Sequence, residues 1–185
     1  MCVIFLDCNF AVENFNLVIM KKTVVIYGST TGNAASAAES IAAKLGSDAT
    51  VKEVSAASKS DLDDFDNIIL GSSTWGDGEL QDDWFGFIST VKNANLSGKT
   101  VAVFGVGDQF SYSDTYVNAM GELYEAATAA GAKIVGATST DGYSFNESSA
   151  VKDGKFVGLA LDYDNQGGLS DDRIAAWVAQ IAPEL

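Results

Sequence analysis

Residues 24–33 constrain the fold of this chain more than any other stretch. Their sequence, Val-Val-Ile-Tyr-Gly-Ser-Thr-Thr-Gly-Asn, changes within a few positions from a β-branched run to glycines, hydroxyl groups and an amide. An alanine-rich segment follows, in which Ala34, Ala38, Ile41 and Leu45 have helical spacing. The pattern predicts a buried strand, a tight loop and the start of a helix, where unpaired backbone N–H groups and the helix dipole favour a phosphate.

This loop lacks the features of a triphosphate site. No lysine or arginine lies between Lys22 and Lys44, and the glycine spacing matches neither G-x-x-x-x-G-K followed by Ser or Thr nor G-x-G-x-x-G. Neutral donors alone suit a permanently bound monophosphate better than a triphosphate with its magnesium. An ordinary strand-to-helix connection with a good cap would use the same residue types, so both interpretations stay open on this stretch alone.

Apolar runs of strand length alternate with segments of helical spacing along the rest of the chain. Further strands are predicted at residues 49–54, 66–70, 100–104 and 133–137, helices at 84–91, 117–127 and 170–181, and a polar connection at 55–64. Such alternation predicts a parallel sheet that is covered by helices on both faces. A chain of 185 residues is long enough for one domain with a substantial core.

Three of the predicted strands end in glycine-rich loops. These loops meet at the carboxyl edge of the sheet, where open α/β sheets bind their ligands. The second loop contains Trp75 and the third contains Tyr112, and either ring alone could simply cap the core. Together, and opposite a phosphate-type loop, the two rings indicate a flat aromatic ligand with one phosphate, which points to flavin mononucleotide (FMN).

The chain is strongly acidic, with 25 Asp and Glu residues against 11 Lys and Arg and a net charge of −14. This balance argues against binding to nucleic acid or anionic membranes and is compatible with a basic protein partner, although solubility alone would also explain it. Histidine is absent, which excludes Ser-His-Asp and Cys-His catalysis. Acidic residues crowd the predicted ligand edge, where they would make further negative charge on a flavin costly; they are Asp77, Glu79, Asp82, Asp83, Asp108 and Asp114.

Residues 1–19 differ from the rest of the chain. They contain both cysteines, Cys2 and Cys8, no basic segment precedes their apolar run, and two acidic residues interrupt any stretch of membrane length. We expect an N-terminal extension of doubtful function, followed by a working domain at residues 20–185 with a net charge of −12. We further expect a monomeric, cytoplasmic protein without membrane insertion.

Three segments resemble the FMN-binding loops of the flavodoxin family. They are Gly28-Ser-Thr-Thr-Gly-Asn33, Ser73-Thr-Trp-Gly-Asp-Gly-Glu-Leu-Gln81, and Gly107-Asp-Gln109 with Tyr112. Residues 138–160 are similar to the insertion of long-chain flavodoxins, and the tail is similar to the cyanobacterial and algal type. The resemblance runs from about Met20 to the C-terminus. It implies a flavodoxin-like three-layer α/β sandwich whose five-stranded parallel sheet has the order 2-1-3-4-5, with the insertion splitting the last strand.

The resemblance also implies a function and a set of cofactor-binding residues. Flavodoxins are low-potential one-electron carriers that hold FMN non-covalently and stand in for ferredoxin, so we expect partners such as ferredoxin-NADP reductase and photosystem I. The matching positions are Ser29, Thr30, Thr31, Gly32, Asn33 and Ala34 for the phosphate, Ser73, Thr74, Trp75, Gly76, Asp77 and Gly78 for one side of the ring, and Gly107, Asp108, Gln109 and Tyr112 for the other. The family usually has a hydroxyl residue at the position of Ala34, so one phosphate donor worth about 1 kcal/mol is missing, although the backbone N–H remains.

Other functions on the same architecture require different residues. A phosphoacceptor receiver domain needs an acidic pair after the first strand and an aspartate at the end of the third, where this chain has Tyr27-Gly28 and Gly71-Ser72. An FMN-dependent NAD(P)H:quinone or azo reductase stays open. It would need a substrate pocket over the ring and a basic clamp for the nicotinamide cofactor, and the sequence shows no such Lys/Arg cluster. A binding module without a cofactor is the third interpretation.

Overall fold

The computed structural model describes residues 22–47 and 49–185, so the predicted extension at residues 1–19 lies outside the described part. Parallel strands cross the main sheet in the order β2 (Ala49–Glu53), β1 (Thr23–Gly28), β3 (Asn67–Trp75) and β5 (Thr100–Val106). Two short strands, β6 (Lys133–Val135) and β10 (Leu159–Leu161), pair in parallel with the beginning and the end of β5. They are the two halves of a split last strand, and the predicted order 2-1-3-4-5 is confirmed.

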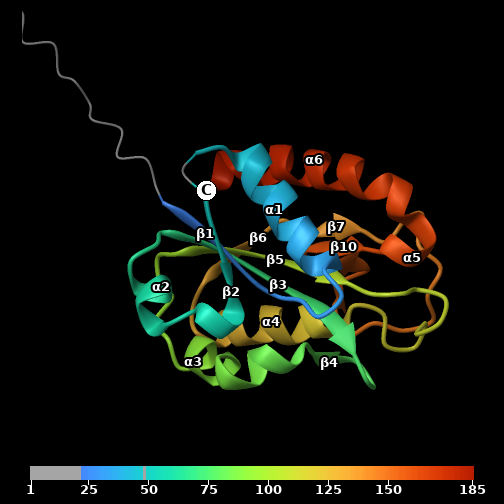
Figure 1. Cartoon of the computed structure of the whole chain (residues 1–185), viewed down its shortest axis with the longest axis horizontal. Coiled ribbons are helices and arrows are strands. Elements are labelled where there is room, and N and C mark those ends of the chain that lie inside the picture. Colours follow the sequence, from blue (N-terminus) through green and yellow to red (C-terminus); the bar gives the residue numbers. More distant parts are fainter. Residues whose placement is uncertain (1–21, 48) are drawn as a thin grey trace, which may run out of the picture.

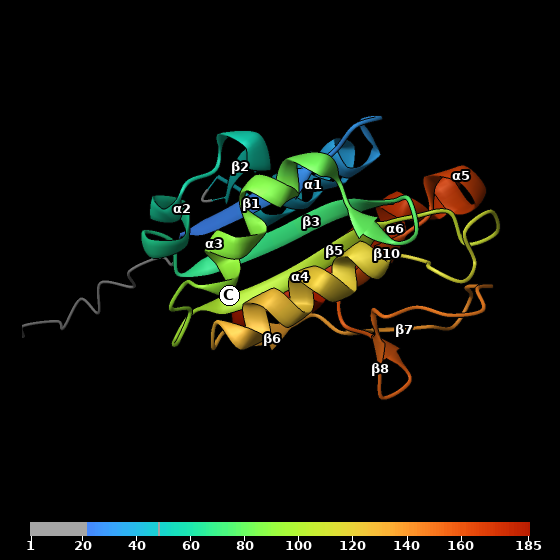
Figure 2. The ribbon, with the colours of Figure 1, turned by 90° about the horizontal axis from the view of Figure 1, so that it is seen from below.

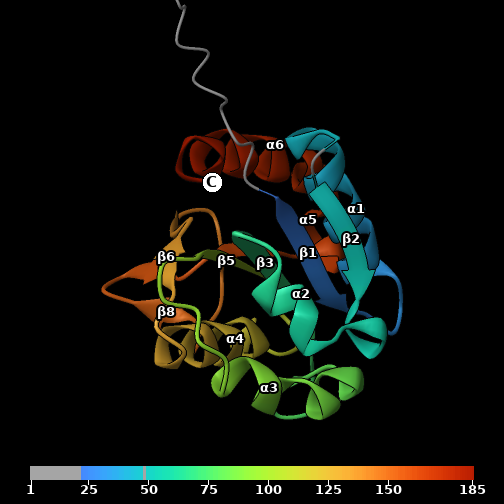
Figure 3. The ribbon, with the colours of Figure 1, turned by 90° about the vertical axis from the view of Figure 1, so that its left-hand side faces the viewer.

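Helices cover both faces of this sheet (Figures 1 and 3). On one face lie α1 (Asn33–Leu45) and α6 (Ser170–Ile181), and on the other lie α3 (Ile88–Lys92) and α4 (Asn118–Ala129). The inner strand β5 is buried along its whole length, as expected for a strand that is covered on both sides. The three-layer arrangement therefore agrees with the prediction.

Two apolar cores fill the two sides of the sheet. Val24 belongs to the core beneath α4, whereas its neighbour Val25 belongs to the core beneath α1 and α6. Successive residues of a strand point to opposite faces, which explains this division. The helix α1 contributes a buried stripe of four alanines and one isoleucine with i, i+3, i+4 spacing to the second core: Ala34, Ala37, Ala38, Ile41 and Ala42. No helix in residues 22–47 and 49–185 has both the length and the apolar character needed to span a membrane.

One predicted connection contains a helix. Residues 55–64 were expected to form a polar connection, but a 3-10 turn occupies Val54–Ala56 and a short helix, α2, occupies Lys59–Asp63. Ser58 and Asp61 form a capping box at the start of α2, in which each side chain accepts a hydrogen bond from the other residue's backbone. This local capping makes a helix of otherwise polar residues, so the prediction was wrong there.

One predicted helix is divided. Residues 84–91 were expected to form a single helix, but they contribute to a 3-10 helix at Asp82–Gly86 and then to α3. Phe87, between the two, has a non-helical φ of −121°. The indole Nε1 of the buried Trp84 donates to the carbonyl of Gly71 at 3.1 Å, which ties the 3-10 segment to β3.

The insertion leaves the sheet after β6 and returns at β10, as predicted. It contains a small antiparallel sheet of β7 (Thr138–Ser139), β9 (Lys155–Phe156) and β8 (Val151–Lys152), which projects beside α4 (Figure 2). Aromatic rings attach it to the rest of the molecule. The ring centroids of Tyr143, Phe145 and Phe156 lie 5.9, 5.4 and 5.9 Å from that of Tyr116, which follows the third glycine-rich loop.

Candidate functional site

The loops after β1, β3 and β5 border one cleft of about 300 Å³ at the carboxyl edge of the sheet. The predicted residues that line it are Thr31, Asn33, Ser73, Thr74, Trp75, Gly76, Gly107, Asp108 and Tyr112. The other predicted residues lie outside the lining: Ala34 belongs to the first turn of α1, and the same loops contain Ser29, Thr30, Gly32, Asp77, Gly78 and Gln109. The structure therefore brings the three predicted loops together around a single cavity.

The first loop is arranged around the start of α1. Gly32 has a φ of 97°, a left-handed conformation that suits glycine, and its N–H donates to the hydroxyl of Ser29 at 3.2 Å. The helix begins at the next residue, Asn33, which lines the cleft together with Thr31. The methyl group of Ala34 is buried in the core, so at this position only the backbone is available to a phosphate.

The second loop is a tight hairpin between β3 and the short strand β4 (Glu79–Leu80). The N–H of Gly78 donates to the carbonyl of Trp75 at 2.9 Å, and Gly76 within the turn has a φ of 51°. A Cβ atom at Gly76 would lie 1.8 Å from the carboxylate of Glu79, but that carboxylate ends an exposed, flexible side chain that can move aside. The turn therefore favours glycine because of its positive φ and not because of space. The indole Nε1 of Trp75 donates to the hydroxyl of Ser73 at 2.9 Å, which fixes the ring at the rim of the cleft.

The third loop is closed by Asp108. Its Oδ1 accepts the backbone N–H groups of Phe110 and Ser111, both at 2.9 Å, and its carbonyl accepts the N–H of Tyr112 at 3.1 Å. This turn presents Tyr112 to the cleft. Tyr112 is 60% exposed and Trp75 is 40% exposed, so two large aromatic surfaces on different loops face the same cavity.

Comparison with known proteins decides the family. The model of the family described as Flavodoxin matches residues 25–177, which is most of the chain. The chain belongs to the flavodoxin family. Curated flavodoxins from Nostoc sp. and Trichodesmium erythraeum are 49% and 48% identical to it, over 89% and 90% of this chain and 98% and 99% of theirs. The crystal structure of Fusobacterium nucleatum flavodoxin bound to flavin mononucleotide superposes with a TM-score of 0.86 at 32% identity, covering 90% of this chain and 99% of that one.

The residues around the cleft suit FMN. In the described part of the chain, the hydroxyl of Thr74 is buried at the cleft without a hydrogen-bond partner, so a polar group of a ligand would satisfy it. The start of α1 offers neutral donors to a phosphate, and two aromatic surfaces flank the cavity. The cleft therefore offers hydrogen-bond donors for the phosphate of FMN and aromatic surfaces for its ring.

Five residues of the cleft lining were not predicted from the sequence: Val106, Thr115, Tyr116, Val117 and Asp164. Val117 was expected to be the first residue of a helix, but it precedes α4 with a φ of 48°, which is rare for a β-branched residue. Residues 115–117, which end in this backbone turn, are part of the cleft lining. Asp164 lies on the short helix α5 (Tyr163–Gln166), far away in the sequence, and no local pattern connects it to the three loops.

The acid sensitivity of the third loop is expected to depend on Asp108. Burial raises the pKa of this carboxyl, but hydrogen bonds from Ser111, from Asn165 and from the N–H of Phe110 outweigh burial and lower the pKa from 3.8 to about 2. Because the pKa of Asp108 is lower in the folded protein than in the unfolded chain, its ionised carboxylate stabilises the folded third loop. This stabilisation is fully present above pH 4 and is lost as the pH falls towards 2. We expect the FMN affinity of the wild type to fall over this window more steeply than that of Asp108→Asn, which keeps the accepting oxygen but does not titrate. A ratio of the two affinities that stays constant from pH 4 to pH 2, measured by flavin fluorescence, would contradict this role.

Proposed function

We propose that this chain is a low-potential one-electron carrier that holds FMN non-covalently in the three-loop cleft and can stand in for ferredoxin. The observation that carries the proposal is the convergence of a neutral helix-start loop with two exposed aromatic rings on one cavity. Residues of the first loop would hold the phosphate, and Trp75 and Tyr112 would border the ring and exclude water from it. FMN supplies the redox chemistry, because its ring accepts and releases electrons singly.

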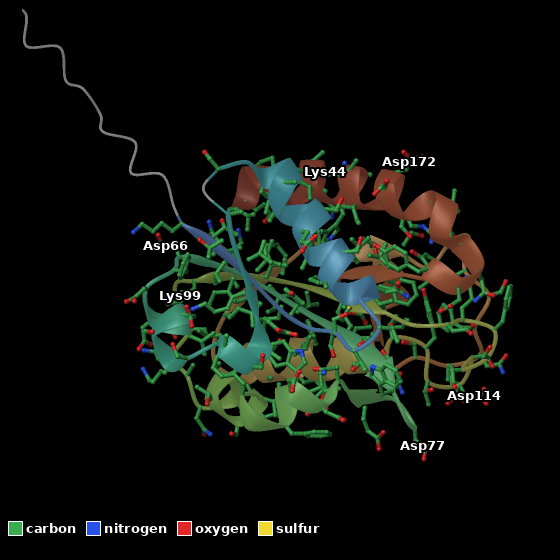
Figure 4. The ribbon with its side chains drawn as sticks, viewed as in Figure 1. Lys44, Asp66, Asp77, Lys99, Asp114 and Asp172 are labelled. Carbon is green, nitrogen blue, oxygen red and sulfur yellow. The ribbon has the colours of Figure 1, made fainter. Side chains whose placement is uncertain are left out.

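The charge around the cleft supports a low reduction potential. Two carboxylates, Asp108 and Asp164, are part of the lining, and Asp77 and Asp114 stand exposed nearby at the same end of the sheet (Figure 4). Negative charge at this end opposes the addition of further negative charge to a bound ring. Within the part of the chain that the structure describes, no Lys or Arg belongs to the cleft lining that could offset it.

The same charges favour a basic redox partner, for which we propose ferredoxin-NADP reductase and photosystem I in a cytoplasmic setting. Opposite charges on two partners accelerate their encounter, and salt screens this attraction over about 10 Å at 0.1 M. We expect the rate constant of reduction by ferredoxin-NADP reductase to fall roughly tenfold or more between about 0.01 M and about 0.5 M salt.

Matched variants test whether the cleft end is responsible for this attraction. The double substitution Asp77→Asn with Asp114→Asn should flatten the salt dependence, whereas Asp66→Asn should leave it nearly unchanged. All three side chains are exposed, but Asp66 lies at the opposite end of the sheet (Figure 4). If the rate constant of reduction had the same salt dependence in all the variants, the acidic charge would contribute to solubility and not to the attraction of the partner.

The phosphate loop is expected to be sensitive to Thr31→Ala. Removing one hydroxyl donor should weaken FMN binding by roughly threefold to tenfold, because a net hydrogen bond contributes about 1 kcal/mol. Riboflavin has no phosphate, so its dissociation constant should stay unchanged, and Thr50→Ala, an exposed threonine of β2, should change neither value. If Thr31→Ala weakened both ligands equally, the loop would not be the phosphate site.

A direct experiment separates the carrier from a flavin reductase. The FMN-loaded protein is mixed anaerobically with NADPH, and the flavin absorbance is followed before and after a catalytic amount of ferredoxin-NADP reductase is added. The proposed carrier is bleached only after the reductase is present. Rapid bleaching by NADPH alone would favour a reductase, and a protein that takes up no FMN would refute both functions.

A further inference from the structure

Asp162 is a fully buried carboxylate at the junction between β10 and α5, with 0% of its surface exposed. Figure 1 places this junction at the same end of the sheet as the three loops. The carboxylate accepts six hydrogen bonds, and every donor is a neutral amide. So many bonds to one buried group imply that several segments depend on it for their positions.

The oxygen Oδ2 of Asp162 holds the third loop. It accepts the backbone N–H of Gln109 at 3.1 Å and the side-chain Nε2 of the same residue at 2.8 Å. The Oε1 of Gln109 in turn accepts the N–H of Ser144 in the insertion at 2.6 Å, and Gln109 is itself fully buried. Gln109 therefore does not line the cleft, but it fixes the backbone between Asp108 and Tyr112, which do.

The oxygen Oδ1 of Asp162 holds the other wall. It accepts the N–H groups of Asp164 at 3.1 Å and of Asn165 at 2.9 Å, which places Asp164 at the cleft. The side-chain Nδ2 of Asn165 contacts both oxygens of Asp162 and also donates to Oδ1 of Asp108 at 2.8 Å. One carboxylate thus connects two lining segments that are about fifty residues apart in the chain.

Only a carboxylate satisfies all of these donors. An amide at position 162 would have one accepting oxygen, and its NH₂ group would face N–H donors in place of the other oxygen. Either the bonds to Gln109 or those to α5 would then be lost, because two buried donors cannot pair with each other.

We propose that Asp162 is a positioning residue of the flavin site, which acts through Gln109 to hold Tyr112 where it meets the ring. The inference rests on the proposed FMN-binding function. The two flavin ligands allow a specific test of this role. The third loop would contact the ring and not the phosphate, so loosening the loop should lower the affinities for FMN and for riboflavin by the same factor.

The test compares Asp162→Asn with Asp61→Asn in two measurements. Asp61 is also a buried carboxylate that accepts backbone and hydroxyl hydrogen bonds at a short helix, but it lies outside the cleft lining. In flavin-free protein, Asp162→Asn should accelerate amide hydrogen exchange at Gln109 by about tenfold or more, while β1 and β3 exchange as in the wild type. In flavin titrations the same variant should weaken FMN and riboflavin by about tenfold each, and Asp61→Asn should change neither affinity.

The possible results separate the claims. Unchanged flavin affinities in folded Asp162→Asn, or a loss for FMN without a loss for riboflavin, would overturn the positioning role. Faster exchange throughout the sheet would show a general stabilising role instead and would also overturn it. If Asp162→Asn did not fold, Gln109→Met, which leaves the bonds to α5 intact, should still weaken both flavins, and equal affinities there would contradict the proposal. A wild type that bound no flavin would refute the proposed function, while exchange at Gln109 would still report whether Asp162 holds the loop.

Discussion

Replacing Tyr112 with alanine is expected to weaken FMN binding by roughly tenfold to a hundredfold. Tyr112 is 60% exposed at the cleft, so a bound ring would cover an aromatic surface that otherwise meets water. Stacking of a planar ring on an aromatic side chain contributes about 1–3 kcal/mol, and each 1.4 kcal/mol is a factor of ten in affinity. Titration of flavin-free protein with FMN, followed by quenching of flavin fluorescence, gives the two dissociation constants.

The same loop provides a matched control for this prediction. Phe110 is 63% exposed, almost the same as Tyr112, but it does not line the cleft. Phe110→Ala should therefore leave the affinity within about twofold of the wild type, and Tyr112→Phe should retain most of it because the ring is kept. Equal losses in Phe110→Ala and Tyr112→Ala would mean that the loop as a whole, and not the Tyr112 ring, accounts for the binding.

Gly158→Ala is expected to destabilise the flavin-free protein by roughly 3 kcal/mol or more. Gly158 stands where the insertion returns to the sheet, immediately before β10. A Cβ atom there would lie 2.0 Å from the carbonyl oxygen of Val103, in the middle of β5. Since β5 pairs with β3 on its other side, its backbone cannot move away without breaking that ladder. Urea denaturation should show a lower midpoint.

Gly167→Ala is the control for Gly158→Ala. Gly167 has helical φ and ψ angles of −53° and −36°, and a Cβ atom there would meet nothing within 4 Å. We expect the free energy of unfolding to increase by about 0.4–1 kcal/mol, because alanine restricts the unfolded chain more than glycine does. Equal effects of the two substitutions would show that the insertion does not rejoin the sheet as closely as the structure indicates.

Much of the fold and of the site follows from local sequence. The runs that form β1, β3 and β5 are apolar without alternation, which is typical of strands buried on both faces. Glycine marks the carboxyl end of β1 and follows β5, whereas β3 continues through Gly71 to Trp75, so its predicted end at residue 70 was too early. Because the three strands are parallel, their carboxyl ends lie at the same edge of the sheet, and the loops that follow them meet there. Trp75 and Tyr112 could be predicted to face one cavity for the same reason, since Trp75 ends β3 and Tyr112 follows β5 at the same edge of the sheet.

What could not be predicted depends on contacts between distant residues. The bond between Gln109 and Asp162 joins positions 53 apart, and nothing near Gln109 distinguishes a buried anchor from a residue that touches the cofactor. Similarly, the left-handed backbone of Val117 opposes the ordinary preference of valine, and surrounding packing must impose it. The division of residues 84–91 has the same origin, because the indole of Trp84 bonds to β3 and not within its own segment.

A crystal structure of this protein with FMN would test the central claim most directly. We predict one FMN per chain in the three-loop cleft, with its phosphate at the start of α1 within hydrogen-bond reach of Thr31 and Asn33, and its ring between Trp75 and Tyr112. A ring bound elsewhere, or a phosphate that contacts lysine or arginine side chains away from α1, would contradict the account.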